Sequence, residues 1–299
     1  MELTLKNLFD GNFYHLCTEG LEAEVIVRDN EDFRVACNYI ALVAWRTRVF
    51  IVAFCVMSNH FHILSACKNR DMAERFLRLF KQMYATYLHN KYHMKSPLKG
   101  VSDSVSLITD INYLRKCIAY ILRNPICAKI CLKVEDYPWS SYPAYFNTAQ
   151  DQFCHSVQSL KGRRRRQVLR SAMDVEGCPY MVDEDGNIKL ESFVRSDIVE
   201  AAFKHSGRYF LYQLGSCNDA RMEYEMVVKP LVTSDDQELL RAAQKRAAEY
   251  YPGHEFSDLS VGERCAMLKN LFFNNKTTVP QLARVLGLPR SLVRKILST

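Results

Sequence analysis

Four short segments in the first half of the chain show the hydrophobic pattern of β-strands. Residues 12–17 and 24–27 carry the aromatic or alternating pattern of half-buried strands, on either side of a turn at Gly20. Residues 49–56 form a continuous apolar run rich in β-branched and aromatic side chains, and residues 61–66 resume the strand pattern after a short break. The sequence therefore predicts a sheet in this half of the chain.

Three helices are predicted among these strands. Apolar residues recur at helical spacing from Asp32 to about residue 46, and again over residues 72–92. A third helix is predicted from about residue 110 to Asn124, before Pro125, and residues 95–109 are expected to form a loop. Because strands and helices mix without a βαβ repeat, the pattern favours an α+β domain with helices packed on an antiparallel sheet.

The remainder of the chain has a helical pattern. We predict three parts: a catalytic domain over residues 1–147, a helical bridging region over residues 148–230 and a helical domain over residues 231–299. In the last part, apolar residues fall at the positions of a helix-turn-helix that starts at Val279 and has Gly287 in its turn. A helical hairpin that serves only for packing is the alternative.

Composition limits the class of protein. The length of 299 residues favours more than one domain, and a hydrophobic content of 48% excludes a disordered chain. The 11 cysteines include no C-x-x-C pair, which indicates reduced thiols and a cytoplasmic location. The most apolar long stretch, residues 36–57, is interrupted by Arg46 and Arg48, so no membrane partner is expected.

Positive charge is informative only where it clusters, since the net charge of +7 is modest for this length. One cluster consists of Arg163, Arg164, Arg165 and Arg166. A second set falls on or near the second helix of the expected helix-turn-helix and consists of Arg290, Ser291, Arg294 and Lys295. Both sets suit contacts with DNA phosphates or bases. The alternative is that they coat solvated helix faces.

Two histidines one residue apart, His60 and His62, accompany the apolar run at residues 61–66. Alternate side chains of a strand share a face, so the two imidazoles project together and can chelate one cation. Two such ligands leave coordination positions open for oxygen ligands and a substrate. Taken alone, the pattern is also that of ordinary partly buried histidines.

A second pair of residues ends the helix predicted before Pro125. Tyr120 and Asn124 are four residues apart and therefore lie on one helical face. A helical tyrosine is more often part of a core, and an asparagine before a proline commonly ends a helix. By themselves, these two residues leave their role open.

Three motifs together resemble the REP-associated branch of the HUH single-tyrosine transposases. They are His-Phe-His at residues 60–62, Tyr-Ile-Leu-Arg-Asn-Pro at residues 120–125 and Asp-Tyr-Pro-Trp-Ser-Ser-Tyr at residues 136–142. The resemblance covers residues 12–146. One departure is that residues 101–109 contain no aromatic or basic residue, which family members usually carry before the tyrosine helix.

The resemblance implies a ferredoxin-like sheet that carries His60 and His62 as ligands of Mg²⁺ or Mn²⁺. It further implies that Tyr120 is the nucleophile and that Asn124 takes the third ligand position. A phenol with a pKa of about 10 is a poor nucleophile at neutral pH and needs a Lewis acid on the phosphate. We therefore expect a 5′-phosphotyrosine intermediate, with single-stranded or hairpin DNA as substrate and adjoining duplex on the tail.

Three questions stay open at the level of sequence. Related transposases act as monomers or as dimers, so a homodimer is one alternative. A domesticated DNA-binding regulator without turnover would also account for the motifs, and residues 101–109 are its best support. A metallohydrolase of small molecules is disfavoured because the further His and Asp ligands of such sites are missing near His62.

Overall fold

The computed structural model describes residues 3–19, 25–95, 97–98, 102–146, 154–216, 236–274, 277 and 279–297. The chain divides into two compact units, Met1–Cys217 and Asn218–Thr299. Among the residues described, no helix combines the length and the apolar composition that crossing a bilayer requires.

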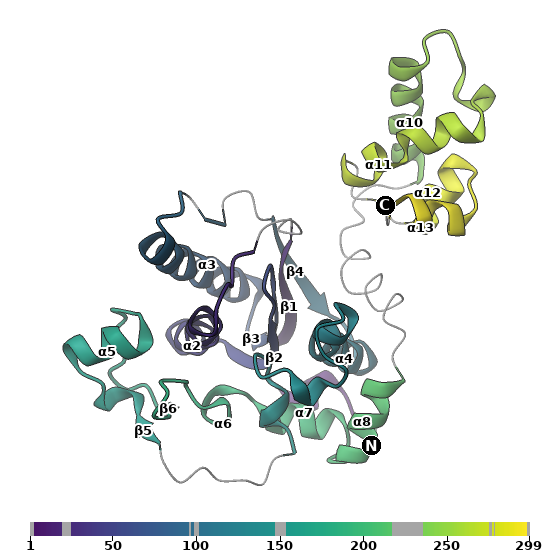
Figure 1. The fold of residues 1–299 in the computed structure, drawn as a ribbon. Helices are drawn as coiled ribbons and strands as arrows, with labels where there is room; N and C mark the ends of the chain where they lie inside the picture. Colours follow the sequence, from purple (N-terminus) through teal and green to yellow (C-terminus); the bar gives the residue numbers. More distant parts are fainter. Residues whose placement is uncertain are drawn as a thin grey trace. The chain divides into compact units, whose positions relative to one another are not determined.

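The first unit is built on a four-stranded antiparallel sheet with the strand order β2-β3-β1-β4 (Figure 1). The strands are β1 (Asn12–Glu19), β2 (Phe50–Val56), β3 (Phe61–Cys67) and β4 (Ser102–Ile108). Helix α2 (Asn30–Thr47) connects β1 to β2, and helix α3 (Arg70–Tyr92) connects β3 to β4. This βαββαβ order is the ferredoxin-like topology, which confirms the predicted fold class.

The edge strand β4 corrects the expected loop at residues 95–109. It pairs with β1 from Phe13↔Ile108 to Glu19↔Ser102. Small polar residues alternate along it, and the side chains of Ser104 and Ser106 are only 9% and 7% exposed. Because an edge strand can bury serines in place of branched apolar residues, the hydrophobic pattern did not reveal it.

The strand predicted at residues 24–27 is wrong in its described part. Val25, Ile26 and Val27 lie in irregular backbone, and the N–H groups of Ile26 and Val27 both donate to the carbonyl oxygen of Ser58 at 2.9 Å. Ile26 and Val27 are buried, so the apolar pattern reflects burial of a connecting segment. The expected turn at Gly20 lies outside the described residues.

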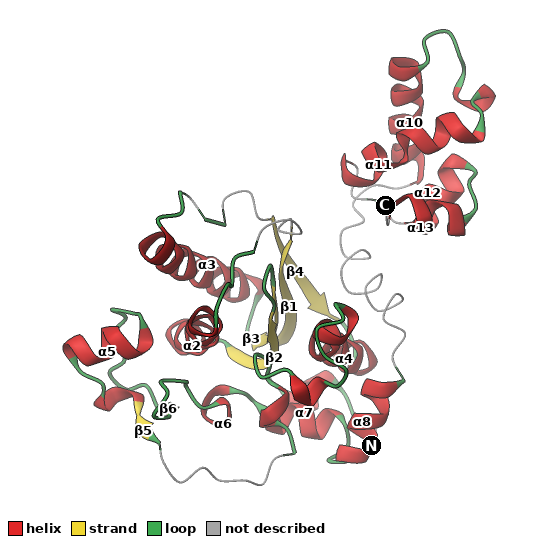
Figure 2. Ribbon diagram, in the orientation of Figure 1, coloured by secondary structure: helices red, strands yellow, loops and turns green. Residues whose placement is uncertain are grey.

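Helix layers cover both faces of the sheet (Figure 2). Phe61 of β3 contacts Phe80 and Tyr84 of α3 with edge-to-face rings, which places α3 on one face. The next residue, His62, contacts Tyr120 of α4 (Ile111–Cys127) on the other face. Alternation along β3 therefore separates an aromatic core from a face that carries histidine.

Asp110 caps the N-terminus of helix α4, and its carboxylate accepts hydrogen bonds from the backbone N–H groups of Asn112 and Tyr113. It continues through Pro125, one turn further than predicted. A proline so close to the end removes a single N–H donor and leaves no long helix beyond it to disturb. The helix thus presents Tyr120 and Asn124 on its last turns.

The segment at residues 154–216 belongs to the same unit. Arg195 donates its backbone N–H to Ile51 of β2 at 2.8 Å, and Asn38 of α2 donates to Gly186 and accepts from Ile188. The remaining elements of the unit are α1 (Leu5–Leu8), η1 (Val134–Asp136), η2 (Tyr142–Ala144), β5 (His155–Ser156), η3 (Val157–Ser159), α5 (Gly162–Leu169), β6 (Met181–Val182), α6 (Leu190–Phe193), α7 (Ser196–Ala202) and α8 (Gly207–Gly215). The short β5–β6 pairing is an exception to the expected all-α region.

The second unit is helical, as predicted. Its elements are α10 (Asp236–Tyr250), η6 (Phe256–Asp258), α11 (Val261–Asn274), α12 (Val279–Leu286) and α13 (Arg290–Leu297). The last two helices are joined by a short turn in which Gly287 has a φ of +64°, a left-handed conformation that glycine adopts without strain. Leu282, Leu286 and Val293 are fully buried in the core of this unit.

Candidate functional site

His60 immediately precedes β3 and His62 is the second residue of that strand, and both side chains lie on the side of the sheet that faces α4. Their ring centroids are 4.8 Å apart. The His62 side chain is only 2% exposed, whereas His60 is partly exposed. The structure thus brings together the two side chains that strand alternation placed on one face.

Helix α4 brings Tyr120 and Asn124 to the same place. The ring centroid of Tyr120 lies 5.2 Å from that of His62, and Oδ1 of Asn124 lies 3.1 Å from Nε2 of His60. The spacing of four residues sets both side chains on the helix face that meets the sheet. All four predicted site residues therefore converge between β3 and α4.

A third histidine, His15 of β1, was not assigned a role from the sequence. Its Nε2 lies 3.2 Å from Nδ1 of His62, and its ring centroid is 6.0 Å from that of Tyr120. In the antiparallel register Cys17 is opposite His62, so His15 is the diagonal neighbour on the same face. A histidine at an inward position of the first strand was the available signal, but its meaning depends on β1 pairing with β3.

Burial keeps two of these imidazoles neutral. Desolvation lowers the pKa of His15 to about 4. Desolvation, with additional repulsion from His60 and His15, lowers the pKa of His62 well below its ordinary value. At neutral pH both rings therefore carry a lone pair on one nitrogen, which is the form that binds metals.

The contacts of His60 provide a test of whether a cation fits. Its Nδ1 lies 2.8 Å from Oδ1 of Asn59, and its Nε2 faces Oδ1 of Asn124. A neutral imidazole has one N–H, so it donates to only one of these oxygens. The other contact is satisfied by a doubly protonated ring, by a reversed Asn124 amide or by a cation between the two atoms.

The distance between those two atoms suits a hexacoordinate cation. Metal–ligand bonds of about 2.1 Å place neighbouring ligand atoms of an octahedron about 3.0 Å apart, close to the 3.1 Å between His60 Nε2 and Asn124 Oδ1. Within the described part of the chain, no group of three or more His, Cys, Asp or Glu side chains could hold a metal. A cation here would therefore depend on Asn124 and on oxygens of a substrate.

The motif at residues 136–142 is structural in this fold. Tyr137 donates its hydroxyl to the carbonyl oxygen of Val56 at 2.7 Å, and Ser141 Oγ accepts the backbone N–H of Phe54 at 2.8 Å. Trp139 stacks on Phe33 of α2 with centroids 5.1 Å apart. The motif thus covers the outer edge of β2 and supports the strand next to β3.

The large aromatic residues in the middle of α3 do not form a surface that could stack on bases. Phe76, Phe80 and Tyr84 are fully buried in the core. Cationic residues occupy the outer face of the helix, and one of them, Lys81, pairs with Asp103 of β4 at 2.6 Å. Helix α3 therefore has exposed basic residues that could bind DNA phosphates, but its buried aromatic residues cannot stack on bases.

The arginines of the basic run lie on α5, away from the histidines. Arg163, Arg164 and Arg166 are exposed, and Arg165 lies 3.9 Å from Asp174. Arg34 of α2 donates to the carbonyl oxygen of Val168 at 2.7 Å, so α5 lies beside α2, on the opposite side of the sheet from α4 (Figure 1). The run and the histidines therefore form separate regions of the first unit.

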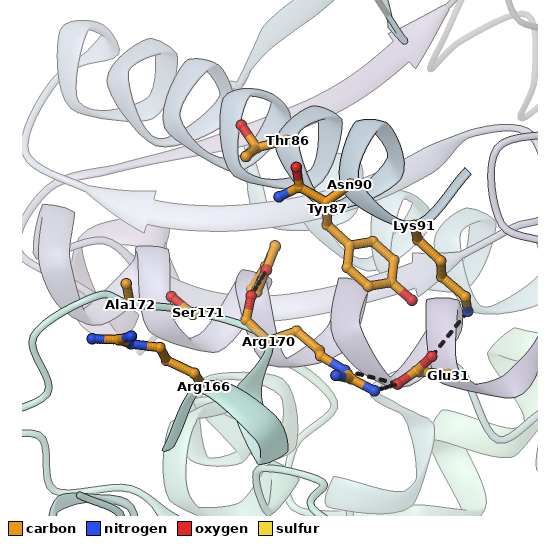
Figure 3. A pocket seen from close by; sticks show the side chains of 10 residues that line it. Glu31, Thr86, Tyr87, Asn90, Lys91, Arg166, Arg170, Ser171 and Ala172 are labelled. Atoms are coloured by element: carbon orange, nitrogen blue, oxygen red, sulfur yellow. Dashed lines mark hydrogen bonds and ion pairs between the residues drawn. The ribbon is translucent and has the colours of Figure 1, made fainter. Parts of the chain in front are cut away.

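A pocket lies where α5 ends and α3 passes nearby, and Figure 3 shows its lining. It is lined by Glu31, Tyr39, Thr86, Tyr87, Asn90, Lys91, Arg166, Arg170, Ser171 and Ala172. Arg170 bonds Glu31 through Nε at 2.8 Å, and Lys91 bonds three carboxylates. Arg170 and Lys91, two of the three cations at this pocket, are thus already paired with carboxylates. Arg170 links the end of α5 to α2, and Lys91 links α3 to the start of α2.

The predicted DNA-contacting residues of the second unit share one exposed surface of α13. These exposed residues are Arg290, Ser291, Arg294 and Lys295. Val293 between them is fully buried. Helix α13 therefore presents the polar face that the sequence predicted.

No protein-family model and no curated protein sequence matches the chain. Among solved structures, the chain is similar to a REP-associated tyrosine transposase bound to a REP hairpin. That match has 16% sequence identity and a TM-score of 0.37, and it covers 44% of this chain and 76% of the other. At this TM-score the likeness does not establish a family or a function, which therefore rest on the residues of the chain itself.

Proposed function

We propose that the chain is a metal-dependent DNA strand transferase in which Tyr120 is the nucleophile. His60, His62 and Asn124 would hold Mg²⁺ or Mn²⁺. The observation that carries the proposal is the convergence of Tyr120 and Asn124 from α4 with His62 of β3 and His60 just before that strand. The three sequence motifs that resemble the REP-associated transposases support it.

The chemistry assigns a distinct task to each group. A bound cation supplies Lewis acidity that polarises a backbone phosphate. The oxygen of Tyr120 forms a bond to phosphorus and loses its proton to solvent, while the bond from phosphorus to the 3′ oxygen breaks and that oxygen takes up a proton. The resulting 5′-phosphotyrosine retains the energy of the phosphodiester, so rejoining to another 3′-OH needs no nucleotide cofactor.

DNA binding is assigned to exposed basic residues in both units. We propose that α13 reads duplex through Arg290, Ser291, Arg294 and Lys295, as the second helix of a helix-turn-helix. Backbone phosphates would meet the basic run of α5, which is formed by Arg163, Arg164, Arg165 and Arg166. Neither set includes the nucleophile or the proposed metal ligands, so binding and cleavage can be measured with separate variants.

The decisive experiment is the formation of a covalent adduct. Labelled single-stranded and hairpin oligonucleotides are incubated with the full chain and Mn²⁺, and the products are resolved under denaturing conditions. The wild-type chain is expected to give a protein–DNA adduct and Tyr120→Phe none. Tyr113→Phe, on the same helix two turns earlier, is the matched control and should retain the adduct. A robust adduct in Tyr120→Phe overturns the assignment of the nucleophile.

The metal ligands are tested in the same assay. His60→Ala and His62→Ala should abolish the adduct yet retain most of the DNA affinity, because affinity depends mainly on phosphate contacts. His89→Ala, an exposed histidine of α3, serves as the control. Unchanged adduct formation in both histidine variants contradicts metal-dependent chemistry at this site.

A second candidate function is a DNA-binding regulator without turnover. Strand β4, beside the histidine-bearing face, carries no basic residue over Ser102–Ile108, and its one acid, Asp103, is paired with Lys81. This candidate predicts equal DNA affinity with and without EDTA and no adduct from any hairpin pool. Metal-stimulated cleavage excludes it.

A further inference from the structure

The ring of His62 has two nitrogens with different surroundings. Nδ1 lies 3.2 Å from Nε2 of His15, within hydrogen-bonding distance, and the two rings are stacked with centroids 5.3 Å apart. In the part of the chain that the structure describes, His15 is the only hydrogen-bonding partner of the His62 ring. Nε2 is therefore the nitrogen that remains for a ligand.

A metal can bind Nε2 of His62 only if that atom carries a lone pair. In a neutral ring this requires the proton on Nδ1, and a buried N–H requires an acceptor. His15 Nε2 is positioned as that acceptor when its own ring proton is on Nδ1. In the reverse arrangement His15 donates to His62, the proton of His62 moves to Nε2, and the ring cannot bind a cation there.

We propose that His15 is a positioning residue that sets the tautomer of His62, so that Nε2 of His62 is free to bind a divalent cation. The inference depends on the proposed metal site. Metal-binding histidines commonly donate their second ring N–H to such a partner, and removal of that partner weakens metal affinity by about 10- to 100-fold. Here the partner is a neutral imidazole on the adjacent strand.

The surroundings explain why a histidine serves at this position. His15 is 2% exposed, and its cross-strand neighbours, Leu64 on β3 and Ser106 on β4, carry no charge. A carboxylate acceptor would bring a charge into this buried site, which is unfavourable without a partner. An imidazole accepts the same hydrogen bond without charge, and its ring packs against that of His62.

The test uses binding of Mn²⁺ alone to the full chain, without DNA. Affinity is measured by calorimetry for the wild type, His15→Phe, His15→Gln and His89→Phe. His15→Phe keeps a flat ring but has no acceptor, and it should weaken Mn²⁺ binding by about 10-fold or more. His15→Gln can accept through its side-chain oxygen and should recover most of the affinity, while His89→Phe should bind as the wild type does.

A second measurement separates positioning from general loss of structure. Long-range ¹H–¹⁵N spectra of the metal-free chain should show the proton of His62 on Nδ1, and in His15→Phe it should shift towards Nε2. Thermal unfolding of each variant confirms that it is folded. An unchanged His62 tautomer, or unchanged Mn²⁺ affinity, in folded His15→Phe overturns the proposal.

Failure of the inference and failure of the proposed function give different results. If His62→Ala binds Mn²⁺ as the wild type does, no metal site exists at this ring, and the role of His15 is overturned with it. If Mn²⁺ affinity depends on His15 and His62 but Tyr120→Phe still forms an adduct, the positioning role stands and the assignment of the nucleophile fails.

Discussion

The two sides of the sheet each hold a polar cluster, and the clusters differ in how their groups are satisfied. Between α2 and α3, Lys91 lies 2.7, 3.0 and 2.7 Å from the carboxylates of Asp29, Glu31 and Asp32 (Figure 3 shows Lys91 with Glu31). Between β3 and α4, the cluster contains three histidines and an asparagine, with contacts between the imidazoles of His15 and His62 and between His60 and the amides of Asn59 and Asn124. The first cluster consists of paired opposite charges, whereas the second consists of imidazole and amide groups.

The polar groups around Asp32 stabilise the fold, whereas those around His60 form the candidate binding site. Asp32 is fully buried, yet it accepts hydrogen bonds from Tyr87, Lys91 and Tyr92 at 2.7–2.8 Å, so its charge is compensated. In the histidine cluster, His60 Nδ1 lies 2.8 Å from Asn59 Oδ1 and His60 Nε2 lies 3.1 Å from Asn124 Oδ1, so these two contacts are with neutral amides. Neutral nitrogen and oxygen atoms held close together are a donor set that suits an added cation.

The largest effect on stability is expected from the self-neutralised cluster. Asp32→Asn removes a buried charge that compensates Lys91 and weakens its bonds to two tyrosine hydroxyls, so it should destabilise the chain by about 3 kcal/mol. Urea unfolding measures this, with exposed Asp10→Asn as the control, which should stay within about 0.5 kcal/mol. Mn²⁺ affinity should not change. A stable Asp32→Asn chain with altered Mn²⁺ binding would reverse the roles of the two clusters.

The pH dependence of stability separates the clusters further. The pKa of His15 is about 4 in the folded chain, below its ordinary value of about 6.5, so the unfolded chain binds more protons between these values. The contribution of His15 to the free energy of unfolding is therefore fully present above pH 6.5, and it is lost as the pH decreases towards 4. Burial raises the pKa values of Asp29 and Glu31, but hydrogen bonds lower both below their ordinary values: chiefly from Lys91 for Asp29, and from Arg170 and then Lys91 for Glu31. Their contribution is lost only at more acidic pH.

Between pH 7 and pH 5, metal-free His15→Phe should therefore lose about 2 kcal/mol less stability than the wild type. Urea unfolding at the two pH values provides the measurement. His89→Phe, at an exposed position outside the site, is the control substitution. Parallel losses in the wild type and His15→Phe would show that His15 does not titrate as a buried group.

The sequence predicts that His60 and His62 share one face, and that Tyr120 and Asn124 share another. It does not predict that the two faces lie against each other. Strand alternation fixes His60 and His62 on one face, and helical spacing fixes Tyr120 and Asn124 on another. The fold then joins the pairs through contacts between residues some 60 positions apart, such as that of His60 with Asn124. His15 was missed because its role follows from β1 lying beside β3, which is a property of the strand order.

Errors in the fold prediction have the same origin. The serine-rich strand β4 lacks an apolar run because it is an edge strand, and its pairing with β1 is decided by the rest of the sheet. Ile26 and Val27 are as apolar as a strand but are buried by packing of a connecting segment. In both cases tertiary context outweighed local propensity.

The smallest effect is expected from the one cation at the pocket of Figure 3 that stands apart from the ion pairs. Arg170 pairs with Glu31, whereas no ion pair of Arg166 occurs among the described residues. Arg166→Gln should leave the free energy of unfolding within about 0.5 kcal/mol of the wild-type value.

If α5 contacts a DNA phosphate, Arg166→Gln should lower DNA affinity a few-fold and reduce the slope of log affinity against log salt by about 1. Fluorescence anisotropy across a salt series measures both quantities, with Arg208→Gln, at an exposed position of α8, as the control. An unchanged slope would mean that the basic run is a solvated helix face, and α13 would then be the remaining candidate for contact with duplex.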